Sequence, residues 1–154
     1  MIGVCQNTVL TYSVDAPNPE YLGGWMSTVE RVATQFPTGL LVITIIDRHA
    51  RAPDDSSRAR IRQTVLRHAA VIQAFAYVVE GEGFGAAAVR SALSLISMAA
   101  RYPFPQKVFS RVEDAVPWML SRPSTQESGA PDAVKLINVA YSLRSQLRLS
   151  AAAG

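Results

Sequence analysis

Cysteine and histidine are scarce in this 154-residue chain, which has one cysteine, Cys5, and two histidines, His49 and His68. A single thiol forms no internal disulfide and supplies no multi-cysteine metal site. Two histidines with no further ligand at suitable spacing argue against a zinc centre. We therefore expect no metal and no cofactor, and a chain suited to a reducing, cytoplasmic compartment.

Long apolar runs and charge of one sign are also in short supply. The longest stretch of low charge, residues 83–100, is interrupted by Arg90 and falls short of the ~20 residues that a membrane span needs. Residues 1–7 do not have the pattern of a signal peptide. The formal net charge of +3 is small beside the dense basic face of a nucleic-acid binder. We expect neither a membrane span nor a nucleic-acid partner.

What is present is enough apolar material for one core, with 49% hydrophobic and 18% charged residues. Strands are expected at 2–5, 8–14, 40–46, 74–80 and 106–111, and helices at 20–35, 57–70, 86–101 and 113–120. A strand–helix alternation after an N-terminal hairpin predicts an α/β domain whose sheet of four or five strands is mostly parallel.

The chain is predicted to divide into a domain at 1–121, a Ser-, Pro- and Gly-rich linker at 122–131, a helix at 132–148 and a disordered tail at 149–154. The last helix is amphipathic, and Leu136 and Leu143 belong to its apolar stripe. It could dock on its own domain, swap onto a second copy or bind a partner helix. Both leucines are therefore candidate interface residues.

The order of elements over residues 2–121 resembles the STAS domain of bacterial anti-sigma-factor antagonists, the SpoIIAA-like proteins. Three local features carry the resemblance: the hairpin that leads into a helix, the aliphatic strand 40–46 followed by Asp47, and the ending Lys107-Val-Phe, Glu113-Asp-Ala-Val and Trp118-Met-Leu. The resemblance implies a signalling domain that binds a kinase, a phosphatase, a scaffold protein or a second copy of itself.

The resemblance also implies a phosphorylation site, because regulated members carry a serine after an aspartate at the start of the second helix. Asp55-Ser56-Ser57 lies at the corresponding place, which makes Ser56 the first candidate and Ser57 the second. A phosphate there would meet free backbone N–H groups. The family's usual glycine is replaced by Arg58, and the same residues also fit a plain helix cap, which Asp55 or Ser56 would supply.

Two loops that follow predicted strands form a candidate ligand site, since ligands of parallel sheets gather at the carboxyl ends of strands. The first loop contains Asp47 and Asp55, and the second contains Gly81, Gly83 and Gly85. The glycines fit a loose form of the dinucleotide-binding pattern. A tight turn that lets helix and sheet pack closely explains the same glycines.

The helix expected at 86–101 is apolar around most of its circumference, which is typical of a helix covered on most sides. A domain of this size offers one helix little cover, so a second protomer or another protein is expected to pack on it. The candidate interface residues are Arg90, Leu93, Ser94 and Ser97. Exposed alanine-rich flanks are the alternative.

These patterns together predict a non-enzymatic regulatory or scaffold protein that acts by protein–protein binding, either with or without a serine phosphorylation switch. The alternative is a small-ligand or nucleotide-binding domain that uses the two loops.

Overall fold

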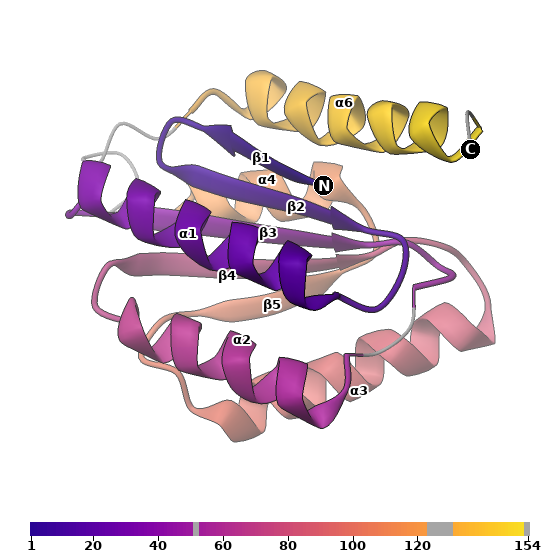
Figure 1. Ribbon diagram of the computed structural model, residues 1–154, viewed down its shortest axis with the longest axis horizontal. Helices are drawn as coiled ribbons and strands as arrows, with labels where there is room; N and C mark the ends of the chain where they lie inside the picture. The colour runs from indigo at the N-terminus through magenta and orange to yellow at the C-terminus, as the bar shows by residue number, and fades with distance from the viewer. Residues whose placement is uncertain (51–52, 123–130, 153–154) are drawn as a thin grey trace.

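The computed structural model describes residues 1–50, 53–122 and 131–152. Five strands alternate with helices along the chain (Figure 1). The strands are β1 (Ile2–Cys5), β2 (Thr8–Ser13), β3 (Leu40–Ile46), β4 (Ile72–Val79) and β5 (Gln106–Phe109). The helices are α1 (Pro19–Gln35), α2 (Asp55–Arg67), α3 (Phe84–Ala100), α4 (Val112–Leu120) and α6 (Ala133–Ala152).

The strands form one sheet in the order β1-β2-β3-β4-β5, in which β1 is antiparallel to β2 and the other neighbours are parallel. The predicted α/β class is therefore confirmed, with five strands in a mixed sheet. The pairing is in register across the centre, so that Leu10 lies beside Ile43 and Ile43 lies beside Ala76. The aliphatic run of β3 is buried on both faces, as its lack of alternation predicts.

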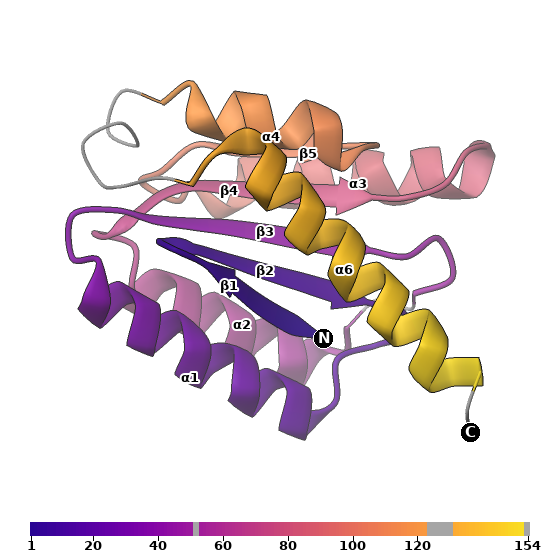
Figure 2. The same ribbon diagram turned by 90° about the horizontal axis from the view of Figure 1, so that it is seen from above.

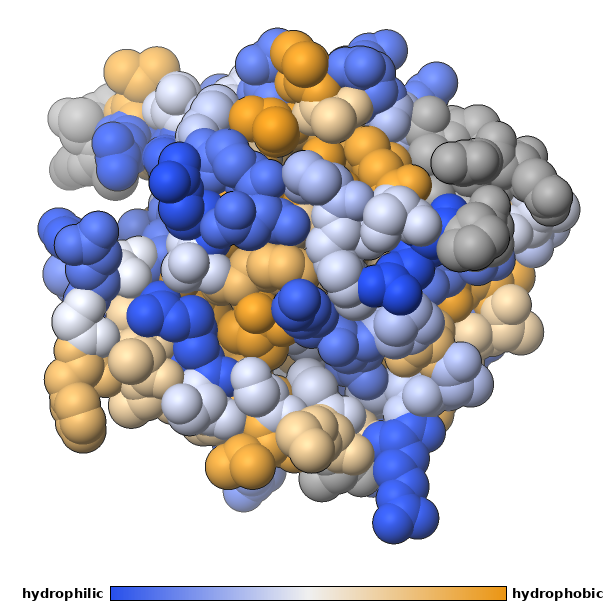
Figure 3. Space-filling model, turned by 180° about the vertical axis from the view of Figure 1, so that it is seen from behind, coloured by the Kyte–Doolittle hydropathy of each residue, from blue (hydrophilic) through white to orange (hydrophobic). Residues whose placement is uncertain are grey.

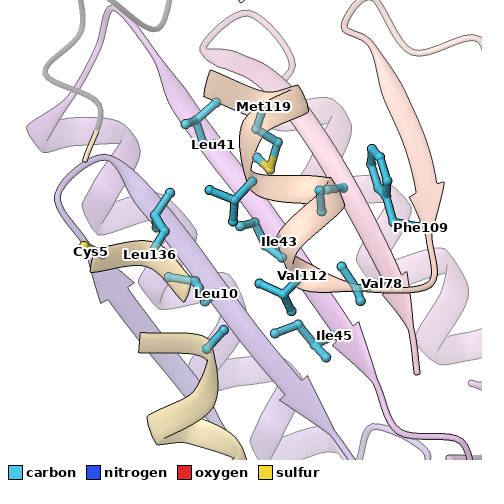
Figure 4. Packing of buried hydrophobic residues seen from close by; sticks show 14 of the residues in the cluster. Cys5, Leu10, Leu41, Ile43, Ile45, Val78, Phe109, Val112, Met119 and Leu136 are labelled. Carbon is cyan, nitrogen blue, oxygen red and sulfur yellow. The ribbon is translucent and has the colours of Figure 1, made fainter. Parts of the chain in front are cut away.

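Helices cover both faces of the sheet (Figure 2). α1 and α2 lie on one face over a core that includes Val9, Val42 and Phe75. α4 and α6 lie on the opposite face, where Leu10, Ile43 and Ile45 point toward them in Figure 4. α3 contacts β4 and β5 and lies along the β5 edge of the sheet, so it has less of the sheet to pack on than the other helices have (Figure 1).

The start of α1 agrees with its sequence signal. Asn18 accepts a hydrogen bond of 2.8 Å from the backbone N–H of Tyr21, and Pro19 is the first residue of the helix. Proline fits there because its fixed φ suits the first turn and its missing N–H would have had no partner. The long apolar face of α1 then buries Leu22, Trp25 and Val29 against the sheet.

The C-terminal helix is longer than predicted. α6 continues to Ala152, so residues 149–152 are helical and the expected disordered tail at 149–154 is corrected for these four. Leucine, serine and two alanines follow Arg148, and alanine has the strongest helix propensity. Residues 153–154 and most of the expected linker, 123–130, lie outside the described residues.

α6 packs on its own domain in this structure, as the first of the three alternatives describes. Leu136 is completely buried and Leu143 is 7% exposed, and Figure 4 shows Leu136 directed toward Leu10 and the sheet. Leu143 packs so closely over β1 that a β-carbon at Gly3 would lie 3.1 Å from its Cδ1 atom. The prediction that these two leucines form an intermolecular interface is therefore corrected, since they are core residues.

Candidate functional site

The two predicted ligand loops lie at the carboxyl edge of the sheet and contact each other. Gly81 has φ of +103°, and a β-carbon at this position would lie 2.7 Å from Cβ of Arg48. Glycine alone tolerates that conformation and that contact. Asp47 begins the same loop as Arg48, and its Oδ1 atom accepts a 2.9 Å hydrogen bond from the backbone N–H of His49. The loop after β3 therefore packs directly on the loop after β4.

The other predicted loop residues belong to the starts of helices. Asp55 is the first residue of α2, and its exposed carboxylate forms an ion pair with Arg58. Gly83, with φ of +87°, immediately precedes α3, and Gly85 lies in its first turn. Open space surrounds the position where each of these two glycines would carry a β-carbon. The structure thus brings Asp47 close to the Gly81 loop. Asp55 lies at the start of α2, and Gly83 and Gly85 lie at the start of α3.

Four side chains from distant parts of the chain meet at this edge, and we call them the carboxyl-edge cluster: Tyr12, Asp47, Glu80 and Arg144. The Tyr12 hydroxyl lies 2.8 Å from Oε2 of Glu80 and 3.3 Å from Oδ2 of Asp47. Arg144 forms an ion pair with Oε1 of Glu80, and both side chains are largely shielded from solvent. Burial, and then the negative charge of Asp47, raise the pKa of Tyr12.

The carboxyl-edge cluster joins the ends of β2, β3 and β4 to α6. Both oxygens of Glu80 have partners: the Tyr12 hydroxyl, which also contacts the carboxylate of Asp47, and the guanidinium of Arg144. A shielded carboxylate whose oxygens are all occupied is suited to holding elements together. We therefore interpret the cluster as an anchor for α6.

Sequence reasoning selected Asp47 but missed Tyr12, Glu80 and Arg144. A signal for Glu80 exists, because it follows an apolar strand just as Asp47 does, and parallel strands end at the same edge. Arg144 had no comparable signal, since its place depends on how α6 crosses the sheet.

A cavity of about 140 Å³ opens between the sheet, α1 and α2, near the same strand ends. Its walls are mostly aromatic and aliphatic, and α3 contributes one wall through Leu93. The described residues that line it are Thr11, Ser13, Asp15, Pro17, Tyr21, Leu22, Trp25, Thr44, Ile46, Ala50, Pro53, Ile61, Phe75, Tyr77 and Leu93.

A row of three hydroxyl-bearing residues crosses the sheet wall of this cavity. The register places Thr11 beside Thr44 and Thr44 beside Tyr77, and all three line the cavity. Tyr77 also stacks on Phe75, with ring centroids 4.6 Å apart. Burial raises the pKa of Tyr77, and the nearby Tyr102 raises it further.

The start of α2 corrects the predicted cap by one or two residues. Asp54, rather than Asp55 or Ser56, is the cap, and its Oδ1 accepts a 2.7 Å hydrogen bond from the backbone N–H of Ser57. Sequence could not rank three consecutive cap-forming residues. The Ser56 side chain is exposed and donates a 3.1 Å hydrogen bond to Asp54, whereas Ser57 is 6% exposed. Of the two phosphorylation candidates, only Ser56 is accessible in this conformation.

The predicted interface residues of α3 divide between internal contacts and the surface. Arg90 donates hydrogen bonds of 3.1 Å to the carbonyl oxygens of Val79 and Gly81, and thus fastens α3 to the end of β4. Ser94 donates to the carbonyl of Arg90 at 2.9 Å, and Leu93 lines the cavity. Ser97 lines an open hollow of about 440 Å³ between α3 and β5.

Among the described side chains of α3, four large apolar ones are exposed instead: Phe84 (90%), Val89 (43%), Leu95 (68%) and Met98 (76%). Phe84, Leu95 and Met98 fall on one side of the helix by its periodicity, and we call these three the outer face of α3. Figure 3 shows tan and orange side chains along the lower left of the surface, where α3 lies. The sequence signal for this face was the high apolar content of the helix, although the residues selected from it were Arg90, Leu93, Ser94 and Ser97 instead.

Within the described ranges, no group of three or more histidine, cysteine, aspartate or glutamate side chains is arranged to hold a metal ion. In the same part of the chain, no helix combines the length and apolar character of a membrane span. Comparisons with protein-family models, curated proteins and solved structures found nothing that matches this chain.

Replacing the cation of the carboxyl-edge cluster tests its anchoring role. We expect Arg144→Met to lower the free energy of unfolding by about 1–3 kcal/mol, because it leaves the shielded Glu80 carboxylate without its ion-pair partner. Urea denaturation at neutral pH measures the change. Arg148→Met, one turn further along α6 and exposed, is the matched control and should shift the value by no more than about 0.5 kcal/mol.

A double-mutant cycle with Glu80→Gln and Arg144→Met separates the interaction energy of this ion pair from the other effects of each substitution. A coupling energy of about 0.5–3 kcal/mol is expected for side chains in direct contact. Additive effects would show that α6 does not depend on this ion pair.

Tyr77 should make stability fall in alkaline solution. Its pKa is raised in the folded state, so above about pH 10 the unfolded chain loses the tyrosine proton while the folded chain keeps it. The contribution of the protonated Tyr77 phenol to the free energy of unfolding is intact below that pH and is lost as the pH rises toward the folded-state pKa. In Tyr77→Phe the slope of unfolding free energy against pH should be shallower by up to about 1.4 kcal/mol per pH unit. Denaturant titrations from pH 8 to 11 would reveal it, and equal slopes would contradict burial of the phenol.

Proposed function

We propose that the chain is a non-enzymatic protein-binding module, of a regulatory or scaffold kind, that pairs with a second copy through the outer face of α3. The observation that carries this proposal is the exposure of Phe84, Leu95 and Met98, which are 90%, 68% and 76% accessible. Large apolar side chains that gather on one exposed element mark interaction sites.

Charge distribution favours a second copy as the occupant. Arg90 is the only charged residue in the sequence from Phe84 to Ala100, and its guanidinium is engaged with the carbonyls of Val79 and Gly81. The outer face therefore offers no charge that would select an acidic or basic partner. Interfaces between identical subunits are more apolar than those of transient complexes, and two-fold dimers are the commonest oligomers.

Three further points support the proposal. An α/β domain with an N-terminal hairpin is compatible with the resemblance to STAS domains, which act through protein partners. Ser56 and His49, a serine and a histidine of the kind that hydrolases combine, have other contacts, since Ser56 donates to Asp54 and His49 accepts a 2.8 Å hydrogen bond from Nε of Arg48. The single, buried thiol of Cys5 suits the cytoplasm, where we place the protein.

The alternative function, a small-ligand domain built on the two loops, has a specific observation in its favour. Ala50 and Pro53, from the segment between Asp47 and Asp55, line the cavity described above. A ligand there would lie beneath this loop rather than on the glycines of the other one.

A carboxylate on the outer face of α3 should prevent pairing. We expect Leu95→Glu to weaken the dimer at least about tenfold, because burying an unpaired carboxylate costs more than the ~1.4 kcal/mol that corresponds to one decade. Sedimentation velocity over a concentration series measures the change. Leu149→Glu is the matched control, since Leu149 is an equally exposed leucine, at 71%, on α6.

A wild-type chain that stays monomeric at high concentration would overturn the pairing. A dimer that Leu95→Glu and Leu149→Glu affect equally would overturn the assignment to α3.

The phosphorylation version of the function rests on Ser56. The backbone N–H of Ser57, and then the hydroxyls of Ser57 and Ser56, lower the pKa of Asp54, so a phosphate on Ser56 would stand beside an ionised carboxylate. A negative group on Ser56 is attracted by the free backbone N–H groups of the first turn and repelled by the Asp54 carboxylate. We expect the repulsion to prevail, so that Ser56→Glu lowers the free energy of unfolding more than Ser56→Ala does. Intact-mass spectrometry of protein from its native cells checks for the phosphate. An unmodified mass under all growth conditions would remove the switch and leave the binding module.

A further inference from the structure

We infer that the cavity between the sheet, α1 and α2 is a binding site for a small, uncharged aromatic molecule that carries one hydrogen-bonding substituent, of the phenol or indole class. The inference goes beyond the proposed function, because it concerns the interior of the domain and does not depend on whether α3 pairs with a second copy. Size, wall chemistry and unpaired hydroxyls each point to this class of ligand.

The size of the cavity suits one aromatic ring. Its volume is about 140 Å³, and an engineered apolar cavity of about 150 Å³ in another protein admits benzene. Aromatic side chains are also part of the lining, which includes Tyr21 and Trp25 from α1 and Phe75 and Tyr77 from β4. Aromatic side chains pack on an aromatic ligand in stacked or edge-to-face arrangements.

The wall formed by the sheet supplies the hydrogen-bonding groups. Among the residues that the structure describes, none hydrogen-bonds the hydroxyl of Thr44 or of Tyr77, and the Thr11 hydroxyl makes only a long contact of 3.5 Å with the carbonyl of Ile43. Both side chains are half-buried, and a ligand that covers their hydroxyls would withdraw them from water, so it must supply a hydrogen-bond partner. A polar substituent of a ligand that lies against this row would supply that partner.

Water fills this role less well than a ring does. A buried water needs two to four polar partners, and the hydroxyl row occupies one wall of the cavity while Leu22, Ile61 and Leu93 form apolar parts of the others. Water away from the row would face carbon on most sides. An aromatic ring with one polar substituent matches both surfaces at once.

The described part of the lining offers an anion no cation. No lysine or arginine is among the lining residues described, and Asp15, an exposed residue, is the one charged group among them. A carboxylate or phosphate would lose its hydration without gaining a cation from these residues, which costs several kcal/mol.

Titration of the isotope-labelled full chain with phenol, benzene and benzoate tests the inference. We expect phenol to bind with a Kd on the order of 1 mM or tighter and to shift the methyl resonances of Ile46, Ile61 and Leu93. Indole should do the same. Benzoate should bind at least about tenfold more weakly, because the described lining residues offer its charge no cation.

Two variants locate the site. Ile46→Phe places a ring in the cavity and should abolish the phenol shifts. Tyr77→Phe keeps the shape and removes one hydroxyl, so phenol should bind about three- to tenfold more weakly, as expected for the loss of one hydrogen bond, while benzene affinity stays unchanged. If Ile46→Phe does not fold, Tyr77→Phe decides alone.

Three results would overturn the inference. They are the absence of saturable shifts with phenol, shifts confined to residues outside the cavity, and equal binding of phenol and benzoate. Because the shifts are read from the monomer or the dimer alike, failure here leaves the pairing of α3 standing, and failure of pairing leaves the cavity testable.

Discussion

The parallel pairing of β3 with β2 and β4 is the constraint on which the rest of the molecule depends. Alternate side chains of β3 point to opposite faces, so that Ile43 and Ile45 enter the core under α4 and α6 while Val42 and Thr44 face α1 and α2. A shift of register by one residue would exchange these faces. The same register aligns the hydroxyl row in the cavity and brings Tyr12 to the ends of β3 and β4.

Most of the fold could be predicted from the sequence because its elements have strong local signals. The aliphatic run Leu40–Ile46 has the bounds of β3, and the order Asn18-Pro19 marks the start of α1. Errors of two or three residues arose where several neighbouring residues could serve equally well, as at Asp54, Asp55 and Ser56. These choices depend on tertiary packing, which outweighs small differences in propensity.

The candidate sites were harder to predict because they depend on contacts between distant segments. The strand ends pointed to Asp47, but nothing local indicated that Arg144 would cross from α6 to Glu80. Leu136 and Leu143 formed an apolar stripe that fits a partner or the parent domain equally well, and only the packed core distinguishes the two. The cavity, likewise, is a space between β2, β3, β4 and three helices, and no single stretch of sequence encodes it.

The position of α3 has a consequence for cooperativity. Leu93 lines the interior cavity, while Leu95 and Met98 of the same rigid helix face outward. The helix contacts β4 and β5, and Arg90 fastens it to the end of β4 with two hydrogen bonds. If an occupant of the cavity displaces Leu93, it changes the binding free energy of a partner on the outer face of α3. Thermodynamic linkage then requires the outer partner to change the affinity of the cavity by the same factor. One helix thus gives this small domain the elements of a two-site switch without any hinge between domains.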